Sequence, residues 1–280
     1  LPGGEPATPL ANGGAFGAKE TAMAPDVARR LADDHGRPVR VLMAREDVVR
    51  FGPKRPPVAA GVRADGTGVL RVARTPGIVA AVASVAPGLV VEEVDVAGPP
   101  TSARIRGAGW VEAAVLMAAV AHQGRPPAHR PPAAGANGQA TVVSPAAGAG
   151  GQATVVSPAG GRATAAVTVD AAGRPLEVSV EVACGAPLDP VVVRSYAVGA
   201  AHMAVSWVCS EAIAVDQEGV PEDLTIRSFG ILRARETPEV RVTIRNDDGQ
   251  PVNGSDAVFA AVAAATWIAQ GLPRRWPTRR

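Results

Sequence analysis

The sequence has few aromatic residues and few cysteines. Only 3% of its 280 residues are Phe, Trp or Tyr, whereas 47% are hydrophobic. A core must therefore be built mainly from small aliphatic side chains, which lets neighbouring backbones pack closely. Cys184 and Cys209 lack the Cys-x-x-Cys spacing that holds zinc or an iron–sulfur cluster, so we expect two buried thiols.

The sequence also lacks signals for membranes, export and nucleic acid. Its longest apolar stretches, 197–208 and 257–268, are too short or too polar to cross a bilayer, which takes about 18 apolar residues. The opening Leu-Pro-Gly-Gly-Glu has neither the basic start nor the apolar centre of an export signal. The 28 basic and 26 acidic residues are scattered and give a net charge of +2, so nucleic acid is not an expected partner. A soluble, cytoplasmic protein is predicted.

Acidic residues are missing from 123–160, where Pro, Gly and Ala dominate. Within this segment, Gly-Gln-Ala-Thr-Val-Val-Ser-Pro-Ala occurs at 138–146 and again at 151–159. Two copies cannot bury a continuous core, so a linker lengthened by local duplication is favoured over a repeat architecture. This linker separates a predicted first lobe, 1–122, from a second lobe, 161–280.

The first lobe shows helix and strand signals in turn. Pro at the first turn and apolar residues four apart predict a helix over 24–34, and the composition of 110–121 also favours helix. Strands are expected at 39–43 and 89–96, and a Gly-containing hairpin turn is expected at 65–68.

The second lobe shows the same mixture. Alternating valines on either side of 172–174 predict a hairpin. Asp189 as N-cap and a proline at the first position predict a long helix ending near Cys209. A strand at 240–244 and a last helix, capped by Ser or Asp and ending near Gln270, complete the pattern. The expected fold class is α+β in two mixed lobes.

One glycine-rich segment carries a family resemblance. Gly13-Gly14-Ala15-Phe16-Gly17-Ala18-Lys19-Glu20 resembles the Gly-Gly-x-Phe-Gly-x-Lys-Glu loop of the molybdenum hydroxylases, the family of xanthine dehydrogenase and aldehyde oxidase. In that family the loop passes beside the molybdenum centre. Glycines there let backbone N–H groups approach an anionic group closely. In an arbitrary protein, such a segment is more often a turn before a helix.

Further segments match the same family in the same order. Residues 36–40 and 45–47 resemble its Lys/Arg-Pro-Val-Arg and Arg-Glu-Asp/Glu motifs. Residues 102–109 resemble its Phe-Arg-Gly-Phe-Gly segment, with Arg106 at the arginine and Ala108 at an aromatic position. Loss of that aromatic removes a stacking face worth about 0.5–1.5 kcal/mol, so a purine-like substrate is not expected.

The second lobe matches through 183–190, which resembles the family's Asp-Cys-Gly-x-x-Ile/Leu-Asn/Asp-Pro. The run at 228–232 resembles a segment that follows the long helix in the family. On this resemblance the chain has the fold of parts of the molybdopterin-binding domains, in a shortened form.

The catalytic position departs from the family. The resemblance implies a glutamate in Gly-Glu-Pro at the start of the last helix, where it acts as a general base. Here Gly254 is followed by Ser255 and Asp256. Both residue types are preferred N-caps, and that structural role is favoured. Asp256 is the local candidate for a catalytic base, displaced by one position.

The resemblance implies a cofactor and partners. The cofactor would be molybdenum–molybdopterin, contacted by Gly13, Gly14, Ala15, Phe16 and Gly17 and by Arg106, which also orients substrate. Iron–sulfur and FAD groups would be held only by partner chains, and a second molybdopterin-binding chain is another candidate partner. Neither the upstream glutamine segment of the family nor its Gly-Gln-Gly segments are visible.

Two functions follow from the resemblance. The first is a subunit of an oxidoreductase that hydroxylates an aldehyde or N-heterocycle with oxygen from water. The alternative is a non-catalytic paralogue that serves as a structural, assembly or regulatory partner of a complete enzyme. A third hypothesis is that the chain is a fragment of a longer product. The four histidines show no paired spacing, so no metal site made of protein ligands is expected.

Overall fold

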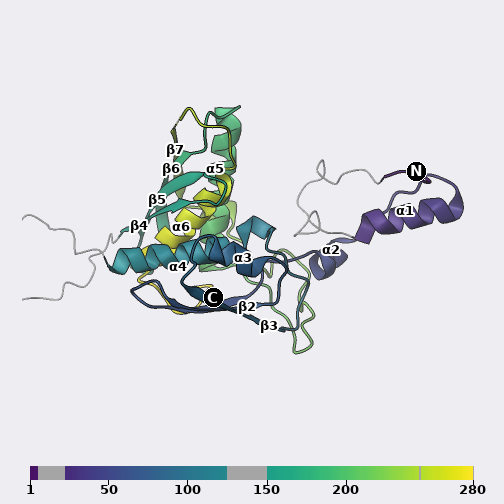
Figure 1. Cartoon of the computed structure of the whole chain (residues 1–280), viewed down its shortest axis with the longest axis horizontal. Helices are drawn as coiled ribbons and strands as arrows, with labels where there is room; N and C mark the ends of the chain where they lie inside the picture. The colour runs from purple at the N-terminus through teal and green to yellow at the C-terminus, as the bar shows by residue number, and fades with distance from the viewer. Residues whose placement is uncertain (6–22, 125–149, 246, 280) are drawn as a thin grey trace, which may run out of the picture.

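The structure is a computed structural model that describes residues 1–5, 23–124, 150–245 and 247–279. The glycine-rich segment at 13–20 and the first repeat copy at 138–146 lie outside these ranges. The described residues form two sheets with helices between and beside them (Figure 1). This agrees with the predicted mixed α/β class.

The smaller sheet has the order β1-β2-β3. Strands β1 (Val58–Val62) and β2 (Gly68–Ala73) form an antiparallel hairpin, and β3 (Leu89–Val94) pairs parallel to β2 after helix α3 (Ile78–Ala83). In the predicted turn, Asp65 accepts hydrogen bonds from the N–H and hydroxyl of Thr67.

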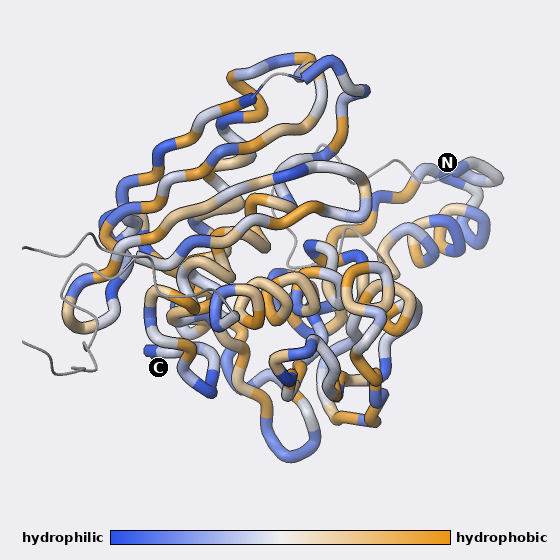
Figure 2. The backbone as a smooth tube through the Cα atoms, turned by 60° about the vertical axis from the view of Figure 1, so that its left-hand side comes forward, coloured by the Kyte–Doolittle hydropathy of each residue, from blue (hydrophilic) through white to orange (hydrophobic). Residues whose placement is uncertain are grey.

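The larger sheet has the order β4-β5-β6-β7. Its strands are β4 (Gly150–Val156), β5 (Arg162–Val169), β6 (Pro175–Ala183) and β7 (Glu239–Arg245). The first three are antiparallel neighbours, and β7 pairs parallel to β6. Polar and apolar residues alternate along these strands (Figure 2), because one face covers the core and the other faces solvent.

The two sheets are connected in the same way. Each has a hairpin, then a helix, then a strand parallel to the second hairpin strand, then another helix. The helix between the strands is α3 in the first half and α5 (Pro190–Cys209) in the second. The helix after the last strand is α4 (Trp110–Gln123) in the first half and α6 (Ser255–Ala269) in the second. Residues of α4 belong to both hydrophobic cores, so this helix joins the halves. The boundaries of the two predicted lobes stay a prediction.

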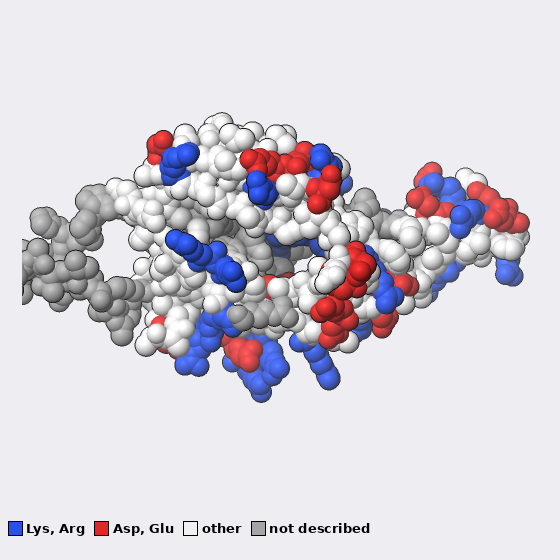
Figure 3. Space-filling model, turned by 90° about the horizontal axis from the view of Figure 1, so that it is seen from below, with Lys and Arg blue, Asp and Glu red and all other residues white. Residues whose placement is uncertain are grey.

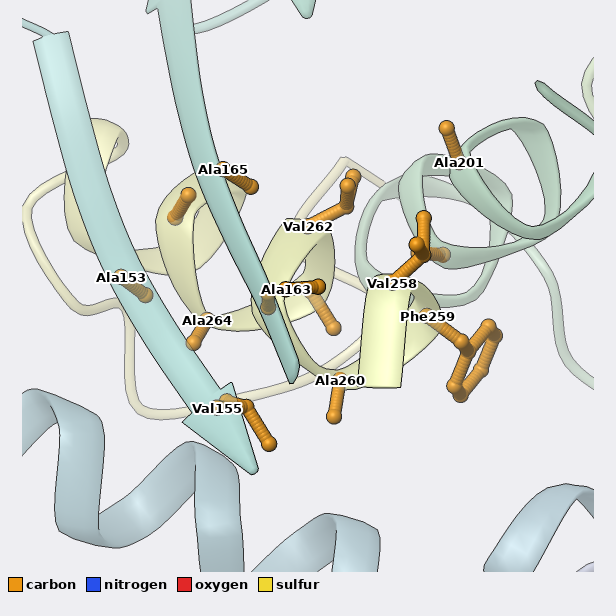
Figure 4. Packing of buried hydrophobic residues seen from close by; sticks show 14 of the residues in the cluster. Ala153, Val155, Ala163, Ala165, Ala201, Val258, Phe259, Ala260, Val262 and Ala264 are labelled. Atoms are coloured by element: carbon orange, nitrogen blue, oxygen red, sulfur yellow. The ribbon is translucent and has the colours of Figure 1, made fainter. Parts of the chain in front are cut away.

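Helix α6 is the centre of the larger core. It packs against α4 and α5 and against β4 and β5. Its alanines and valines face those of the sheet, with Ala153, Ala163 and Ala165 directed at the helix (Figure 4). Every residue from 257 to 266 is buried. The expectation of a core of small side chains is confirmed here.

Helix α5 is long and apolar enough to cross a membrane by length and composition alone. A core helix passes the same test, and the second half of α5 is buried against α6 and the sheet. Its start is as predicted: the Asp189 carboxylate accepts hydrogen bonds from the N–H groups of Val191 and Val192 at 2.8 and 3.3 Å.

Helix α1 (Met23–His35) matches the predicted helix and projects from the rest of the described chain (Figure 1). It carries charges of both signs, and the face seen in Figure 3 shows acidic and basic side chains in mixed groups. The sequence prediction did not include α2 (Arg45–Phe51) or α3.

Two sequence predictions need correction. The stretch 39–43 is not a strand, because it pairs with no strand among the described residues. The proposed linker, 123–160, is wrong for its last part, since residues 150–156 are strand β4 and pair with β5. Alternation of small buried and polar exposed residues is a strand signal that the Gly and Pro content concealed.

Candidate functional site

Arg106 lies in a short 3-10 turn, Ile105–Gly107, just before α4. Its backbone is left-handed, with φ 49° and ψ 39°, and Gly107 follows with φ 61°. A Cβ at Gly107 would lie 2.0 Å from Nε1 of Trp110, so a glycine is needed there for the indole to pack beneath the turn. The local sequence therefore fixes the direction in which Arg106 leaves the backbone.

The guanidinium of Arg106 reaches the start of α6. Its Nη1 lies 3.2 Å from Oγ of Ser255 and 3.2 Å from Oδ1 of Asp256, and it donates to both. Its Nη2 lies 3.5 Å from the sulfur of Met203, and its central carbon lies 5.8 Å from the ring centre of Phe259. The structure thus brings together Arg106 and the helix start that the sequence analysis singled out.

The start of α6 is an internal network. Oδ1 of Asn253 accepts hydrogen bonds from the N–H of Ser255 at 2.9 Å and from its hydroxyl at 2.8 Å. Nδ2 of Asn253 donates to Oδ2 of Asp256 at 3.3 Å. Both carboxylate oxygens of Asp256 are therefore engaged, one by Arg106 and one by Asn253.

The predicted capping role of Ser255 and Asp256 is wrong in detail. The N-cap is Gly254, which has no side-chain cap, and the two residues occupy the first turn. Asp256 still interacts favourably there with the positive end of the helix dipole. Asn253, which the sequence analysis did not consider, supplies the side-chain acceptor for the helix entrance.

A second arginine, Arg55, lies behind the Arg106 turn. Its Nε donates to Oε1 of Glu112 at 2.6 Å, and its Nη1 donates to the carbonyl oxygens of Ile105 and Arg106, each at 3.1 Å. Its guanidinium carbon lies 4.5 Å from the ring centre of Trp207. Arg55 thus holds the turn from which Arg106 projects. The one sequence signal that could have indicated Arg55 is its place in a Pro-rich stretch, 52–57.

A cavity of about 330 Å³ lies beside the helix start. It is bounded by β6, α5 and α6. Tyr196 on α5 is largely exposed at this cavity, whereas Cys184 is buried. Lining residues are Val182, Cys184, Val193, Tyr196, Ala197, Val252, Asn253, Gly254, Ser255 and Val258.

Both thiols are buried, as the sequence predicted. Burial raises the pKa of Cys184 above its ordinary value, and the nearby charge of Asp247 acts in the same direction. Burial also raises the pKa of Cys209. Both groups are therefore held as neutral thiols at neutral pH, which suits core residues rather than nucleophiles or metal ligands.

The described residues do not offer a binding set for an anionic metal–pterin group. The polar side chains at the helix start are bonded to one another. The buried, unpartnered polar atoms in the described ranges are Nη2 of Arg55 and Oγ of Ser157, and neither residue lines the cavity. Within the same ranges, no group of three or more His, Cys, Asp or Glu gathers. Gly13, Gly14, Ala15, Phe16 and Gly17 lie outside the described residues, so their predicted contact with a cofactor stays a prediction.

No family model matches the chain, and no curated protein matches its sequence. Several solved structures are similar over part of their length. Quinoline 2-oxidoreductase from Pseudomonas putida 86 gives a TM-score of 0.33 at 13% identity, covering 76% of this chain and 35% of that chain. A Cu,Mo-CO dehydrogenase in the carbon monoxide reduced state gives 0.32 at 12% identity, covering 74% and 33%. A reconstituted CO dehydrogenase from Oligotropha carboxidovorans gives 0.31 at 12% identity, with the same coverage of 74% and 33%.

These similar structures are oxidoreductases by name, and this chain spans about one third of their length.

Proposed function

We propose that this chain is a non-catalytic relative of the molybdenum hydroxylase large subunits, acting as a structural or assembly partner of a complete enzyme. The observation that carries the proposal is the closed network at the start of α6. The family's glutamate base is replaced by Ser255, and the neighbouring Asp256 is bonded through both oxygens.

A base must accept a proton from a group that it can reach. Ser255 has no such capacity at neutral pH without a partner, and its hydroxyl donates to Asn253. Asp256 is ion-paired with Arg106 at 3.2 Å and also accepts a hydrogen bond from Asn253, so both of its oxygens already have partners within the chain. The network therefore supports a structural role for this helix start.

The same pairing occupies Arg106. In the family resemblance, the arginine at this position orients substrate or cofactor. Here the side chains of Arg106 and Asp256 are 27% and 26% exposed, so the guanidinium is largely covered, and its charge is offset by an adjacent carboxylate. An anionic ligand would have to displace that carboxylate.

A second candidate function keeps the enzyme activity with a displaced base. It is favoured by the partial exposure of Asp256 at the helix start that the sequence analysis identified. In this version the chain takes part in hydroxylation of an aldehyde or N-heterocycle, and its partner chains carry the iron–sulfur and flavin groups. The two proposals differ in the molybdenum content and in the aldehyde-oxidising activity that they predict for the native complex.

The test uses the full chain isolated from its own cells with whatever chains accompany it. The scaffold proposal predicts accompanying chains with iron–sulfur and flavin absorbance. It also predicts less than stoichiometric molybdenum for each copy of this chain. Recovery of the chain without such partners, or with one molybdenum per copy, would contradict it.

The catalytic question is tested by variants assayed for aldehyde-dependent dye reduction. Ser255→Glu restores the family's carboxylate, and Ser255→Gln is the control of matching size without a base. Activity of the natural chain that disappears in Asp256→Asn would support the second candidate. No activity in the natural chain or in Ser255→Gln, whether or not Ser255→Glu is active, supports the scaffold proposal.

A further inference from the structure

The first half of α5 presents an apolar surface to solvent. Four neighbouring apolar residues are exposed there, namely Leu188, Val191, Val192 and Tyr196, and Leu188, just before the helix, is 93% exposed. The second half of the same helix is buried against α6 and the sheet. A helix that is apolar on every side is normally covered on every side, and a group of neighbouring exposed apolar residues marks a contact surface.

This surface is almost free of charge. Arg194 is the one Asp, Glu, Lys or Arg residue of α5. Its Nη1 donates to the carbonyl oxygen of Val242 on β7 at 2.6 Å, so its charge is directed at the sheet edge. The carboxylate of Asp189, which precedes the helix, caps two N–H groups of the first turn. Two copies of the surface therefore meet without close opposition of like charges, which would cost several kcal/mol.

The exposed face has a spacing suited to helix–helix packing. Val192, Ser195 and Gly199 follow one another at intervals of three and four residues, and Leu188 precedes Val192 by four. Residues at these intervals share one face of a helix, and we call the four residues the α5 stripe. Ser195 is exposed, and a Cβ at Gly199 would meet nothing within 4 Å. The stripe is therefore large at its first two positions and small, with open space, at its last two.

We propose that two copies of this chain associate through the α5 stripe, with the two helices antiparallel about a twofold axis between positions 193 and 194. Leu188 then meets Gly199 of the second copy, and Val192 meets Ser195 of the second copy. Each large side chain fills the open space above a small residue. A twofold axis repeats both contacts, so the same stripe supplies both sides of the interface.

The order of large and small residues favours a second copy as the occupant. Antiparallel self-association needs large residues in one half of a stripe and small ones in the other, whereas an unrelated partner imposes no such order. A parallel pair would oppose Leu188 to Leu188 and leave a gap between the two Gly199 residues. The dimer does not depend on the function proposed above.

The size of the contact sets its strength. The stripe extends over about three helical turns, which gives a small interface beside the roughly 800 Å² per partner of a stable one. The dimer is therefore expected to form reversibly, with a fraction that rises with protein concentration.

The first test follows association of the full chain by sedimentation, from low micromolar to near-millimolar concentration. Val192→Asp places a carboxylate in the centre of the contact and should weaken the dimer by about tenfold or more. Val79→Asp is the control, because Val79 lies in helix α3 and is 46% exposed, as Val192 is. Circular dichroism checks that both variants keep the fold. A chain that is monomeric throughout, or a dimer that both variants weaken equally, would overturn the proposal.

The second test reads the antiparallel alignment. Full-length Val192→Cys is mixed with Ser195→Cys, one of them carrying a longer tag, and the mixture is oxidised. The natural thiols are buried and do not compete. Disulfide-linked dimers that join mainly unlike variants are the expected result, because only these two positions face each other closely. Absence of cross-linked dimers, or like pairs that form as readily as unlike ones, would overturn the proposal.

Discussion

Nη1 of Arg106 lies 3.2 Å from Oδ1 of Asp256 and joins two segments that are 150 residues apart in the sequence. One is the turn before α4 and the other is the first turn of α6. The contact therefore fastens the first half of the chain to the central helix of the second.

Removal of this contact should reduce stability. Asp256→Asn and Arg106→Gln are each expected to lower the free energy of unfolding by about 1 kcal/mol, with a coupling energy of about 0.5–1 kcal/mol in a double-mutant cycle. Urea titrations at low and high salt provide the measurement. The pair Arg245–Glu181, on the exposed sheet face, is the control and should couple more weakly. If the double variant at Arg106 and Asp256 loses only the sum of the two single-variant losses in unfolding free energy, the contact contributes nothing to stability.

Arg55→Met should destabilise the chain more strongly, by about 3 kcal/mol. The change leaves Glu112 as a largely buried carboxylate, because the Arg55 and Glu112 side chains are 14% and 9% exposed. It also removes one hydrogen bond from each of the carbonyl oxygens of Ile105 and Arg106. Chemical unfolding of Arg55→Met beside the exposed control Arg71→Met checks this. A loss equal to that of the control would contradict the structural role given to Arg55.

Gly185→Ala should cost about 2 kcal/mol or more. Gly185 has φ 78°, and a Cβ there would lie 2.2 Å from the carbonyl oxygen of Gln250, which is rigid backbone. Gly199→Ala, in a helix where a Cβ meets nothing within 4 Å, is the control and should be neutral or stabilising. Equal melting temperatures for the two variants would contradict the close approach. The Cys-Gly pair that resembles the family thus has a packing reason here.

Lys54 should give the chain a distinct pH dependence. Burial lowers the pKa of its ammonium from 10.5 to about 8 in the folded chain. Between these two values the unfolded chain binds more protons than the folded one, so this residue makes stability rise with pH over that window. Unfolding of the natural chain and of Lys54→Met should be compared at pH 7.5, 9 and 10.5. The natural chain should gain relative to the variant, whereas parallel curves would contradict the shifted pKa.

Much of the fold could be predicted from local chemistry. The cap at Asp189, with its proline, predicted α5, and alternating valines around 172–174 predicted the hairpin of β5 and β6. These signals are local, because a cap or an alternation is complete within a few residues. The stretch 39–43 has the same apolar content as a strand and is not one, since strand formation also needs a neighbour.

The site was predicted only in part. Arg106, Ser255 and Asp256 were identified from the family resemblance, and the structure brings them together. Asn253 and Arg55 were missed, because their roles depend on tertiary contacts that no spacing encodes. Strand β4 was missed for a different reason: it lies in a Gly- and Pro-rich stretch, and its buried positions are the small residues Gly151, Ala153 and Val155.

Helix α6 is enclosed on all sides, and between 260 and 265 its side chains are alanines and one valine, none of them exposed. Small side chains let α4, α5, β4 and β5 approach this helix closely. Because it is packed against all four elements, a shift of the helix would disturb contacts on several sides at once. The side chains at its entrance are consequently fixed in space by the whole core, and any ligand would meet a preset surface rather than an adaptable one.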